Sequence, residues 1–531
     1  MMGTLSGTGE LIRLAFHRDR VRIPLWTLAC VVTTAGAAAA TADLYPSERE
    51  RTVFAEGVNA VPALVAFYGR IYDPSSLGAA AVLKLTGFGA ALVALLMIFT
   101  VVRHTRAEEE SGRLELIGAG ALGRHAALAA GLVVAATTSL AIGVLTAVGL
   151  IVAGLPVAGS LALGLGWTMA GWVFGAIAAV TAQLSRTARL ATGGAASVLG
   201  VTYLVRAVGD SGPEWLSWFS PIGWVQQIRP FAGERWWVAL ISVAVTLQLA
   251  LVAVRLGDRR DMGAGVLAER PGPARAGRSL RGTGGLLWRL NRSTLLAWTS
   301  VYLVLGLVLG NLANGIGRFL DNPKAERLIT ALGGQQALTD AFFAAELGIS
   351  GVIAAVYAMS VVVRLHNEEQ ALHVEQLLAT PVTRTRLLAG YVLLAVAGSA
   401  IPLAAAGLGA GLSSGLQTGR PGADIGRLTA AALVQLPAVW VLAGLACALF
   451  GLLPRRLGAV WAVLAAIVVV GEFGVVFGVP QAILNLSPFT HLPSLPGSTA
   501  GITALPWLVL LAAGLTALGM AGFRRRDIGT S

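Results

Sequence analysis

RHTRAEEESGRLELIGAGALGR, the stretch from Arg103 to Arg124, returns in altered form as RLHNEEQALHVEQLLATPVTR from Arg364 to Arg384. Each copy follows an apolar run that ends in Val-Val-Arg, and each precedes another apolar run. A shift of 260 positions matches four residues of the first copy, Glu108, Glu109, Glu115 and Arg124, with Glu368, Glu369, Glu375 and Arg384. The repeat predicts two charged elbows, 103–125 and 364–386, in a duplicated membrane protein.

The composition indicates a protein of the lipid bilayer. Hydrophobic residues make up 56% of the chain, charged residues make up 12%, and the mean hydropathy is +0.74. A soluble domain carries about 25% charged residues. The apolar residues fall in runs of roughly twenty, the length of a transmembrane helix. Backbone groups in lipid must be satisfied internally, so we expect an all-α polytopic fold.

Twelve membrane spans are predicted, six in each half. They cover residues 22–41, 78–102, 126–154, 161–183, 190–208 and 236–254, then 294–314, 347–363, 387–412, 428–451, 458–478 and 504–522. Two further matches support a tandem duplication: Ser220-Pro221 with Ser487-Pro488, and Arg259-Arg260-Asp261 with Arg525-Arg526-Asp527. Both halves begin and end on one side, which predicts parallel repeats.

The segment between the halves indicates which side faces the cytoplasm. Residues 263–285 are rich in Gly, Pro and Arg, as expected of a linker between a first half, 1–262, and a second half, 286–531. From residue 255 to 292 there are nine arginines against three acids. Such an excess marks cytoplasmic loops, so both termini are expected in the cytoplasm. The same arginines account for the net charge of +12, and no soluble basic domain exists to bind nucleic acid.

Other segments are expected to lie along the membrane faces. Residues 5–20 and 286–292 read as amphipathic stubs on the cytoplasmic face. The Pro-broken segments 213–231 and 479–497 are too polar to span and suit re-entrant or interfacial positions on the outer face. Trp218, Pro221 and Pro488 are the candidate outer-gate residues in these segments.

The elbows themselves carry helix signals. Glu109 and Arg113 are four residues apart, as are Arg106 and Glu110, which favours continuation of the second span as a helix. Thr380-Pro381 reads as a helix start, with Thr as N-cap and Pro in the first turn. A plain solvated loop is the alternative. The matched glutamates of the two copies favour a docking element for a partner.

The sequence contains no motif for an energy-yielding reaction. Its only lysines, Lys84 and Lys324, stand outside any Gly-rich phosphate-binding loop, so we expect neither enzymatic activity nor a nucleotide site. No Cys or His spacing favours a metal site. Arg206 and Glu472 are the candidate intramembrane charge pair, although either residue alone could reach the outer interface.

Glu-Glu followed by Glu-Gln-Leu-Leu-Ala-Thr-Pro-Val-Thr-Arg, residues 375–384, resembles the coupling-helix region of type-2 ABC exporter permeases. The Arg-Arg-Asp-Ile end at 525–528 is similar as well. The whole chain resembles the duplicated twelve-span permeases of actinobacterial antibiotic exporters, the tetronasin- or polyketide-resistance type. In the first copy Gly118-Ala119-Gly120-Ala121 replaces Ala-Thr-Pro-Val, a departure from the pattern.

The resemblance implies a permease subunit in the bacterial plasma membrane that exports hydrophobic or amphipathic compounds such as antibiotics. A separate ATP-binding subunit, in two copies, would hold ATP and Mg and dock on the two elbows. Its contacts would include the matched elbow residues together with Thr380, Pro381 and Arg384. The stubs would be connecting helices, and spans two, five, eight and eleven would line the central cavity.

Two other functions fit twelve apolar spans. A proton-coupled secondary drug carrier would transport without ATP hydrolysis and would depend on Glu472. A membrane enzyme or scaffold acting on lipids would need a cluster of polar residues, and the sequence offers none.

Overall fold

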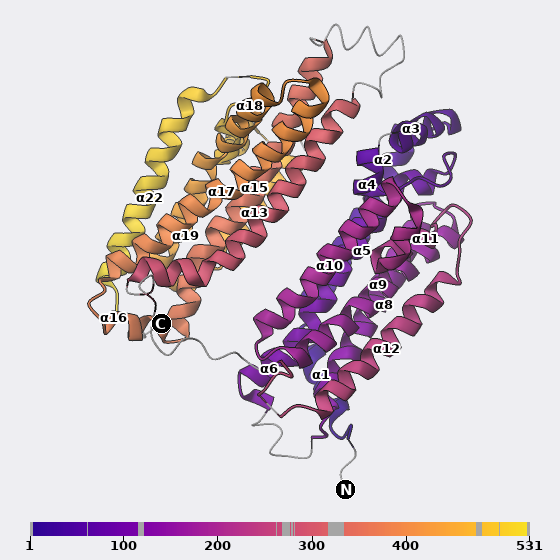
Figure 1. Cartoon of the computed structure of the whole chain (residues 1–531), viewed down its shortest axis with the longest axis horizontal. Coiled ribbons are helices and arrows are strands. Elements are labelled where there is room, and N and C mark those ends of the chain that lie inside the picture. The colour runs from indigo at the N-terminus through magenta and orange to yellow at the C-terminus, as the bar shows by residue number, and fades with distance from the viewer. Residues whose placement is uncertain are drawn as a thin grey trace. The chain divides into compact units, whose positions relative to one another are not determined.

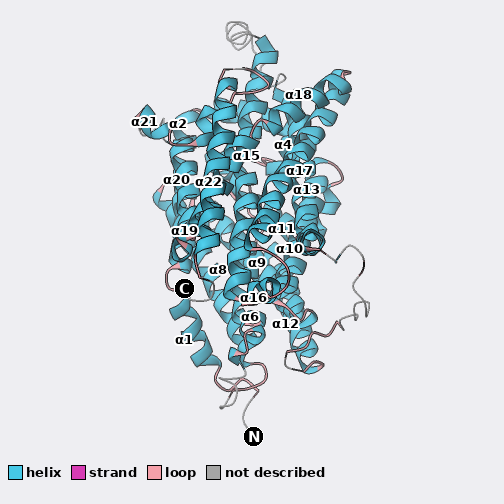
Figure 2. Cartoon of the chain, turned by 90° about the vertical axis from the view of Figure 1, so that its left-hand side faces the viewer, coloured by secondary structure: helices cyan, strands magenta, loops and turns pink. Residues whose placement is uncertain are grey.

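The computed structural model describes residues 4–527 except residues 61, 115–121, 262, 268–276, 278–279, 281, 317–333, 474–479 and 499. Two compact units divide the chain, Met1–Pro271 and Gly272–Ser531, and the division falls inside the Gly-, Pro- and Arg-rich segment 263–285. Every regular element in the described ranges is a helix, and Figure 2 has no ribbon in the strand colour there. The all-α prediction is confirmed.

The first unit is a bundle of long helices with short helices at its two ends (Figure 1). Its elements are α1 (Thr8–Arg18), α2 (Arg22–Leu44), α3 (Glu48–Ala60), α4 (Pro62–Tyr68), α5 (Leu77–His104), α6 (Arg106–Glu110), α8 (Ala126–Val152), α9 (Val157–Leu184), α10 (Ala188–Ser211), η1 (Glu214–Phe219), α11 (Pro221–Gln227) and α12 (Val238–Asp258).

The second unit repeats this plan with a longer opening helix. Its elements are α13 (Thr283–Ile316), α15 (Gly334–Gln370), α16 (His373–Leu378), α17 (Arg384–Thr418), α18 (Pro421–Leu433), α19 (Leu436–Leu452), η4 (Pro454–Arg456), α20 (Ala459–Phe473), α21 (Gln481–Leu484), η5 (Pro488–His491), η6 (Ile502–Ala504) and α22 (Leu505–Arg525).

Eleven of the twelve predicted spans correspond to described helices long and apolar enough to cross a bilayer. The predicted span 458–478 coincides with α20, whose apolar part is shorter, and residues 474–479 lie outside the described ranges. The predicted span 428–451 is counted among the eleven over Pro421–Leu452, although its helix is interrupted between α18 and α19. Pro437 explains the break, since it has no N–H to donate to the Leu433 carbonyl and its ring crowds that carbonyl.

The two predicted stubs differ in structure. In the first unit the stub is a separate helix, α1, because the chain turns at residues 19–21 before α2 begins. Pro24 stands in the first turn of α2, where a proline opposes continuation of the preceding helix. The prediction of a separate stub at 286–292 is wrong: these residues are the first turns of α13, whose 34 residues include no proline.

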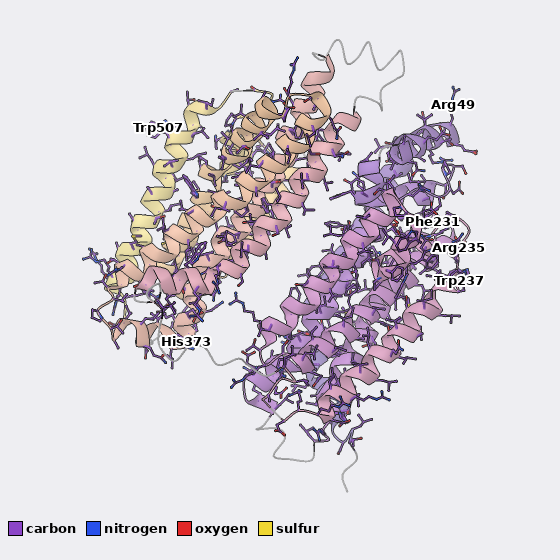
Figure 3. The ribbon with its side chains drawn as sticks, viewed as in Figure 1. Arg49, Phe231, Arg235, Trp237, His373 and Trp507 are labelled. Carbon is purple, nitrogen blue, oxygen red and sulfur yellow. The ribbon has the colours of Figure 1, made fainter. Side chains whose placement is uncertain are left out.

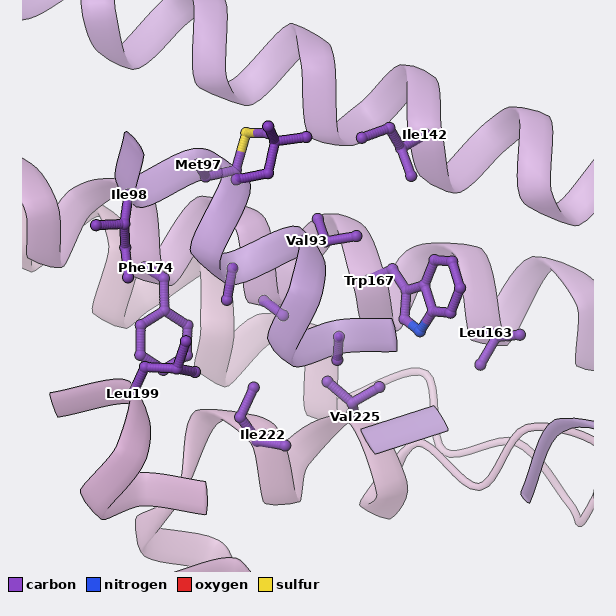
Figure 4. Close-up of a cluster of buried hydrophobic side chains, with 14 of the residues drawn as sticks. Val93, Met97, Ile98, Ile142, Leu163, Trp167, Phe174, Leu199, Ile222 and Val225 are labelled. Atoms are coloured by element: carbon purple, nitrogen blue, oxygen red, sulfur yellow. The ribbon is translucent and has the colours of Figure 1, made fainter. Parts of the chain in front are cut away.

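The core of the first unit lies between α5, α8 and α9. Figure 4 shows Met97, Ile142 and Trp167 among its buried side chains. Helices α8 and α9 touch backbone to backbone, because a Cβ on Gly143 would lie 2.3 Å from the carbonyl oxygen of Gly164. Small residues at such crossings favour helix packing in a membrane, where no hydrophobic effect drives helices together.

The core of the second unit includes a close crossing of α19 and α22. A Cβ on Gly451 would lie 2.0 Å from the Gly519 carbonyl oxygen, so this crossing also requires small residues. Beside the crossing, the buried rings of Phe450 and Phe523 lie 5.1 Å apart. This ring pair marks the end of the unit where the second elbow lies.

Each unit begins and ends beside its own elbow. Asp19, which follows α1, lies 2.7 Å from His104 Nε2 at the end of α5. Arg364 at the second elbow donates to the Leu290 carbonyl near the start of α13, at 3.1 Å. Figure 1 places α1 and α6 at one end of the first unit, and α16 at one end of the second. We call this the elbow end of each unit and the opposite one the far end.

Candidate functional site

The first elbow is fastened by a buried carboxylate. Glu109 lies on α6 with its side chain 8% exposed, and its two oxygens accept from both terminal nitrogens of Arg260, at 2.5 and 2.9 Å. The Gly263 N–H donates to the same carboxylate at 2.6 Å, and Arg106 Nη1 lies 3.1 Å from it. A bidentate arginine–carboxylate contact is strong and fixes orientation as well as distance.

The same cluster reaches the end of α9. Arg260 Nε donates to Gln183 Oε1 at 2.6 Å, and Arg106 Nε donates to the Ala182 carbonyl at 3.0 Å. Residues 264–267 run beside the end of α9, where the Val266 and Leu267 N–H groups donate to the carbonyls of residues 183 and 184. The first elbow, the end of α9 and the chain after α12 therefore form one connected structure.

The second elbow has a matching contact. Glu369, with its side chain 3% exposed, accepts from Arg526 Nη2 at 2.6 Å. The Arg526 guanidinium also lies over the rings of Phe450 and Phe523, with 4.8 and 5.2 Å to their centroids. Such cation–π contacts stabilise a guanidinium that has left water. Phe450 belongs to α19, so this elbow too is joined to the ends of two spans.

A second arginine closes each elbow. Arg124 Nη2 donates to the carbonyls of Asp258 and Arg260, at 2.9 and 3.2 Å. Arg384 Nη1 donates to the carbonyls of Arg524 and Arg526, at 3.4 and 2.6 Å. The two sets of hydrogen bonds match under the shifts that relate the halves, which are 260 positions for the elbows and 266 for the ends of the halves. We call Glu109–Arg260 and Glu369–Arg526 the elbow clamps.

Comparison with known proteins identifies relatives of this chain. Residues 280–524 match a family model described as the C-terminal domain of the multidrug efflux system permease Rv1217c. The multidrug efflux system permease protein Rv1217c of Mycobacterium tuberculosis is 44% identical over 525 residues, which are 98% of this chain and 95% of that relative. The chain belongs to this family of multidrug efflux permeases. The resemblance to an exporter permease, first carried by the elbow motif, is confirmed.

The first glutamate of each elbow pair is partly exposed in the permease. Glu108 accepts from Arg18 of α1 at 2.6 Å, and Arg113 lies 3.6 Å from it. Glu368 lies 2.7 Å from His373 and 3.7 Å from Arg364. The expected pairing of Glu109 with Arg113 is therefore wrong, because Glu109 turns inward to Arg260 and leaves Glu108 near Arg113. The expected pairing of Arg106 with Glu110 is also wrong. Arg106 pairs with Glu109 instead, and Glu110 accepts from the N–H of residue 188.

The tip of the second elbow is a short exposed helix. Glu375 is exposed in the first turn of α16, and Figure 3 shows His373 at the elbow end of the second unit. Its counterpart Glu115 lies outside the described residues. A role for these two side chains in docking stays a prediction.

The predicted helix start at Thr380-Pro381 is wrong. The short helix α16 precedes these residues, and α17 begins only at Arg384. Thr383 is the N-cap, since its hydroxyl oxygen accepts from the Arg386 N–H at 3.2 Å. Thr380 instead donates to the Leu377 carbonyl at 2.6 Å, at the end of α16. Pro381 therefore follows a helix, the position where a proline prevents its continuation.

The far end of the first unit holds the Trp-rich segment. Ser220 accepts from the Gly223 N–H at 3.2 Å, which caps α11, and Pro221 is its first residue. The remaining six residues of α11 are buried, and the helix packs against α5 and α9. Trp218 stacks on Trp237 with ring centroids 5.5 Å apart. The Trp-rich segment thus packs onto its own unit, and its re-entrant or interfacial position in the membrane stays a prediction. In the second unit Ser487 caps η5 in the same way, with Pro488 first.

Arg206 is fully buried with partners from its own unit. Its Nη1 lies 3.4 Å from Asp210, and its Nη2 donates to the carbonyls of Ala66 and Phe67 at 2.9 and 3.0 Å. Asp210 in turn accepts from the Ser217 hydroxyl at 2.6 Å, which ties α10 to η1. The side chain of Glu472 lies outside the described residues, so its pairing with Arg206 stays a prediction.

The contacts of three charged residues were not predicted from the sequence. Arg260 and Arg526 appeared only as an anchor of the repeat, although their matched positions in two Arg-Arg-Asp ends were a signal for a shared contact. Asp210 was missed although its spacing of four residues from Arg206 is that of a helical ion pair.

Proposed function

We propose that the permease is the membrane subunit of an ATP-driven exporter that moves hydrophobic or amphipathic compounds out of the cell. A separate ATP-binding subunit, present in two copies, holds ATP and Mg and docks on the two elbows. The protein lies in the bacterial plasma membrane, and its elbows and both termini face the cytoplasm.

The duplicated elbow clamps carry this proposal. A partner that moves an exposed elbow can drive transport only if the movement is transmitted to the spans. A bidentate or ring-covered arginine resists displacement, because losing one hydrogen bond to a charged group costs about 1.5–3 kcal/mol and breaking a buried ion pair costs about 3–5 kcal/mol. Through Arg260 and Arg526, a movement of either elbow reaches the last span of its half and the end of α9 or α19.

The arginine distribution supports the orientation. The elbow end of the first unit carries Arg255, Arg259 and Arg260, and the Arg-rich segment 263–285 follows directly. Cytoplasmic loops carry such an excess of arginine. This distribution supports elbows on the cytoplasmic side, where ATP and an ATP-binding subunit occur.

The nature of the cargo follows from the spans. Their described side chains are mostly apolar, and Arg206 and Asp210, the buried charged pair on α10, lie 3.4 Å from one another. A pathway between such helices suits compounds that partition into a membrane. The relative from Mycobacterium tuberculosis is named a multidrug efflux permease, in keeping with cargo of this kind.

Transport in inside-out vesicles tests the proposal. The permease is co-expressed with the ATP-binding protein encoded beside it, and uptake of a fluorescent hydrophobic drug and hydrolysis of ATP are measured together. We expect ATP-dependent uptake and drug-stimulated hydrolysis. Charge reversal by Glu115→Lys with Glu375→Lys should uncouple the two while the protein remains in the membrane.

Two outcomes contradict the proposal. Uptake that follows an imposed proton gradient and ignores ATP supports the secondary carrier. Normal drug-stimulated hydrolysis with normal uptake in the double variant removes the elbows from the mechanism.

A further inference from the structure

The residue at the tip of each elbow has a left-handed backbone. Gly112 has a φ of 71° and Leu372 a φ of 62°, and the shift of 260 that relates the elbows relates these two residues. Their hydrogen bonds match as well. The Gly112 N–H donates to the Glu109 carbonyl and the Leu372 N–H to the Glu369 carbonyl, both at 3.0 Å. The two tips are thus the same turn, which ends the helix that carries the clamp glutamate.

Glycine is the expected residue in this turn, and leucine is not. A left-handed residue commonly closes a helix, and glycine holds that position because it has no Cβ to crowd the backbone. A leucine there is strained, and local strain in a protein frequently marks a functional position. Leu372 is 55% exposed, so packing within the permease compensates only part of that strain.

We propose that Leu372 seats the second elbow in an apolar recess of the ATP-binding subunit. The inference rests on the proposed function, since it concerns the subunit that docks there. At the first elbow Gly112 offers no side chain, so the two docking sites are unequal and the second binds more tightly. The strained backbone holds the leucine outward, where a partner can cover it.

The surroundings of Leu372 indicate the chemistry of the recess. Glu375 is exposed three residues later, and Glu368 is partly exposed beside His373. An anionic lipid surface repels such carboxylates and attracts basic segments instead. An apolar recess with basic side chains at its rim fits both the leucine and its acidic neighbours.

Affinity measurements on Leu372→Gly provide the test. The permease in nanodiscs is titrated with the purified ATP-binding protein encoded beside it, and thermal unfolding is recorded in parallel. We expect binding about tenfold weaker, the loss of a partly buried leucine side chain. The midpoint of thermal unfolding should stay or rise, because glycine relieves the strained backbone.

Leu453→Gly is the matched control. Leu453 is 49% exposed at the elbow end of the second unit, in ordinary backbone with a φ of −136°. This change should lower the thermal midpoint and leave the affinity within about threefold. The opposite responses of two equally exposed leucines separate a docking role from a general loss of apolar surface.

A tryptophan at residue 372 distinguishes the partner from the membrane. Because the chain already holds 13 tryptophans, the emission of this one is taken as the difference between Leu372→Trp and the unchanged permease under the same conditions. A shift of this difference to shorter wavelength only after the subunit is added supports the proposal. The same shift in nanodiscs without the subunit places the residue in lipid and overturns it. If the unchanged permease binds the subunit and Leu372→Gly binds as well, the inference fails while the proposed function stands. If the unchanged permease does not bind the subunit, both fail.

Discussion

Neutralising the two clamp glutamates should destabilise the halves to different degrees. In Glu109→Gln the side chain keeps its shape, but Arg260 and Arg106 both lose the carboxylate that they share. In Glu369→Gln only Arg526 loses its carboxylate, and two aromatic rings still cover its guanidinium. The first half should therefore suffer more from the same chemical change.

The size of the difference follows from the contacts. Removing one partner of a buried ion pair costs about 3–5 kcal/mol, and Glu109 has two arginines and a backbone N–H to leave unsatisfied. A single hydrogen bond to a charged group is worth about 1.5–3 kcal/mol, which suits Glu369 and Arg526 with their ring contacts kept. We expect Glu109→Gln to be the more destabilising by about 2 kcal/mol.

The assay is unfolding of the purified permease in detergent, followed by tryptophan fluorescence against temperature and against added denaturing detergent. Glu375→Gln is the control, because an exposed glutamate on α16 should change stability by less than about 0.5 kcal/mol. The double variant Glu369→Gln with Arg526→Gln should recover part of the loss, since no unpaired buried charge remains. A loss in Glu375→Gln as large as in Glu109→Gln, or a reversed order of the two clamp variants, would refute the reasoning.

Three further outcomes follow from the same contacts. Thr383→Ala should cost about 1 kcal/mol by removing the cap of α17, and Thr380→Ala should cost less than half of that in the same unfolding assay. Arg384→Ala removes a 2.6 Å bond to the last described turn of the chain, so amide hydrogen exchange in residues 520–526 should accelerate. Asp210→Asn leaves the buried Arg206 without a counter-charge and should cost about 3–5 kcal/mol, with faster proteolysis of the segment 213–220 than in the unchanged protein.

The spans could be predicted because the bilayer acts on every residue in the same local way. Helices α5 and α8 begin and end within two residues of their predicted limits. The prediction of a separate stub at 286–292 was wrong. A stub is separated from the span that follows it only where a proline opposes a continuous helix. The first half has Pro24 at that point and the second half has no proline there.

The inward or outward direction of the elbow side chains could not be predicted from the sequence. Glu108 and Glu109 are adjacent and chemically the same, and local helix spacing assigned Glu109 to Arg113. The residue that decides is Arg260, which lies 151 positions away. Such a contact is formed by the tertiary fold, and only the repetition of Arg-Arg-Asp at the ends of both halves indicated it. The error at Thr380 has a similar origin, since Thr383 offers an equal local signal three residues later.

The two halves differ in where they have kept the same contact and where they have diverged. The clamp is present in both, although its arginine is held by an amide in one half and by two aromatic rings in the other. The tip has the same backbone in both, yet it carries glycine in one half and a strained leucine in the other. Under the proposed function, movement has to be transmitted in each half, which requires the clamp twice. Docking of the proposed partner can be unequal, which leaves the residue at the elbow tip free to differ. Loss of a clamp should therefore impair either half, whereas loss of the tip side chain can matter only in the second.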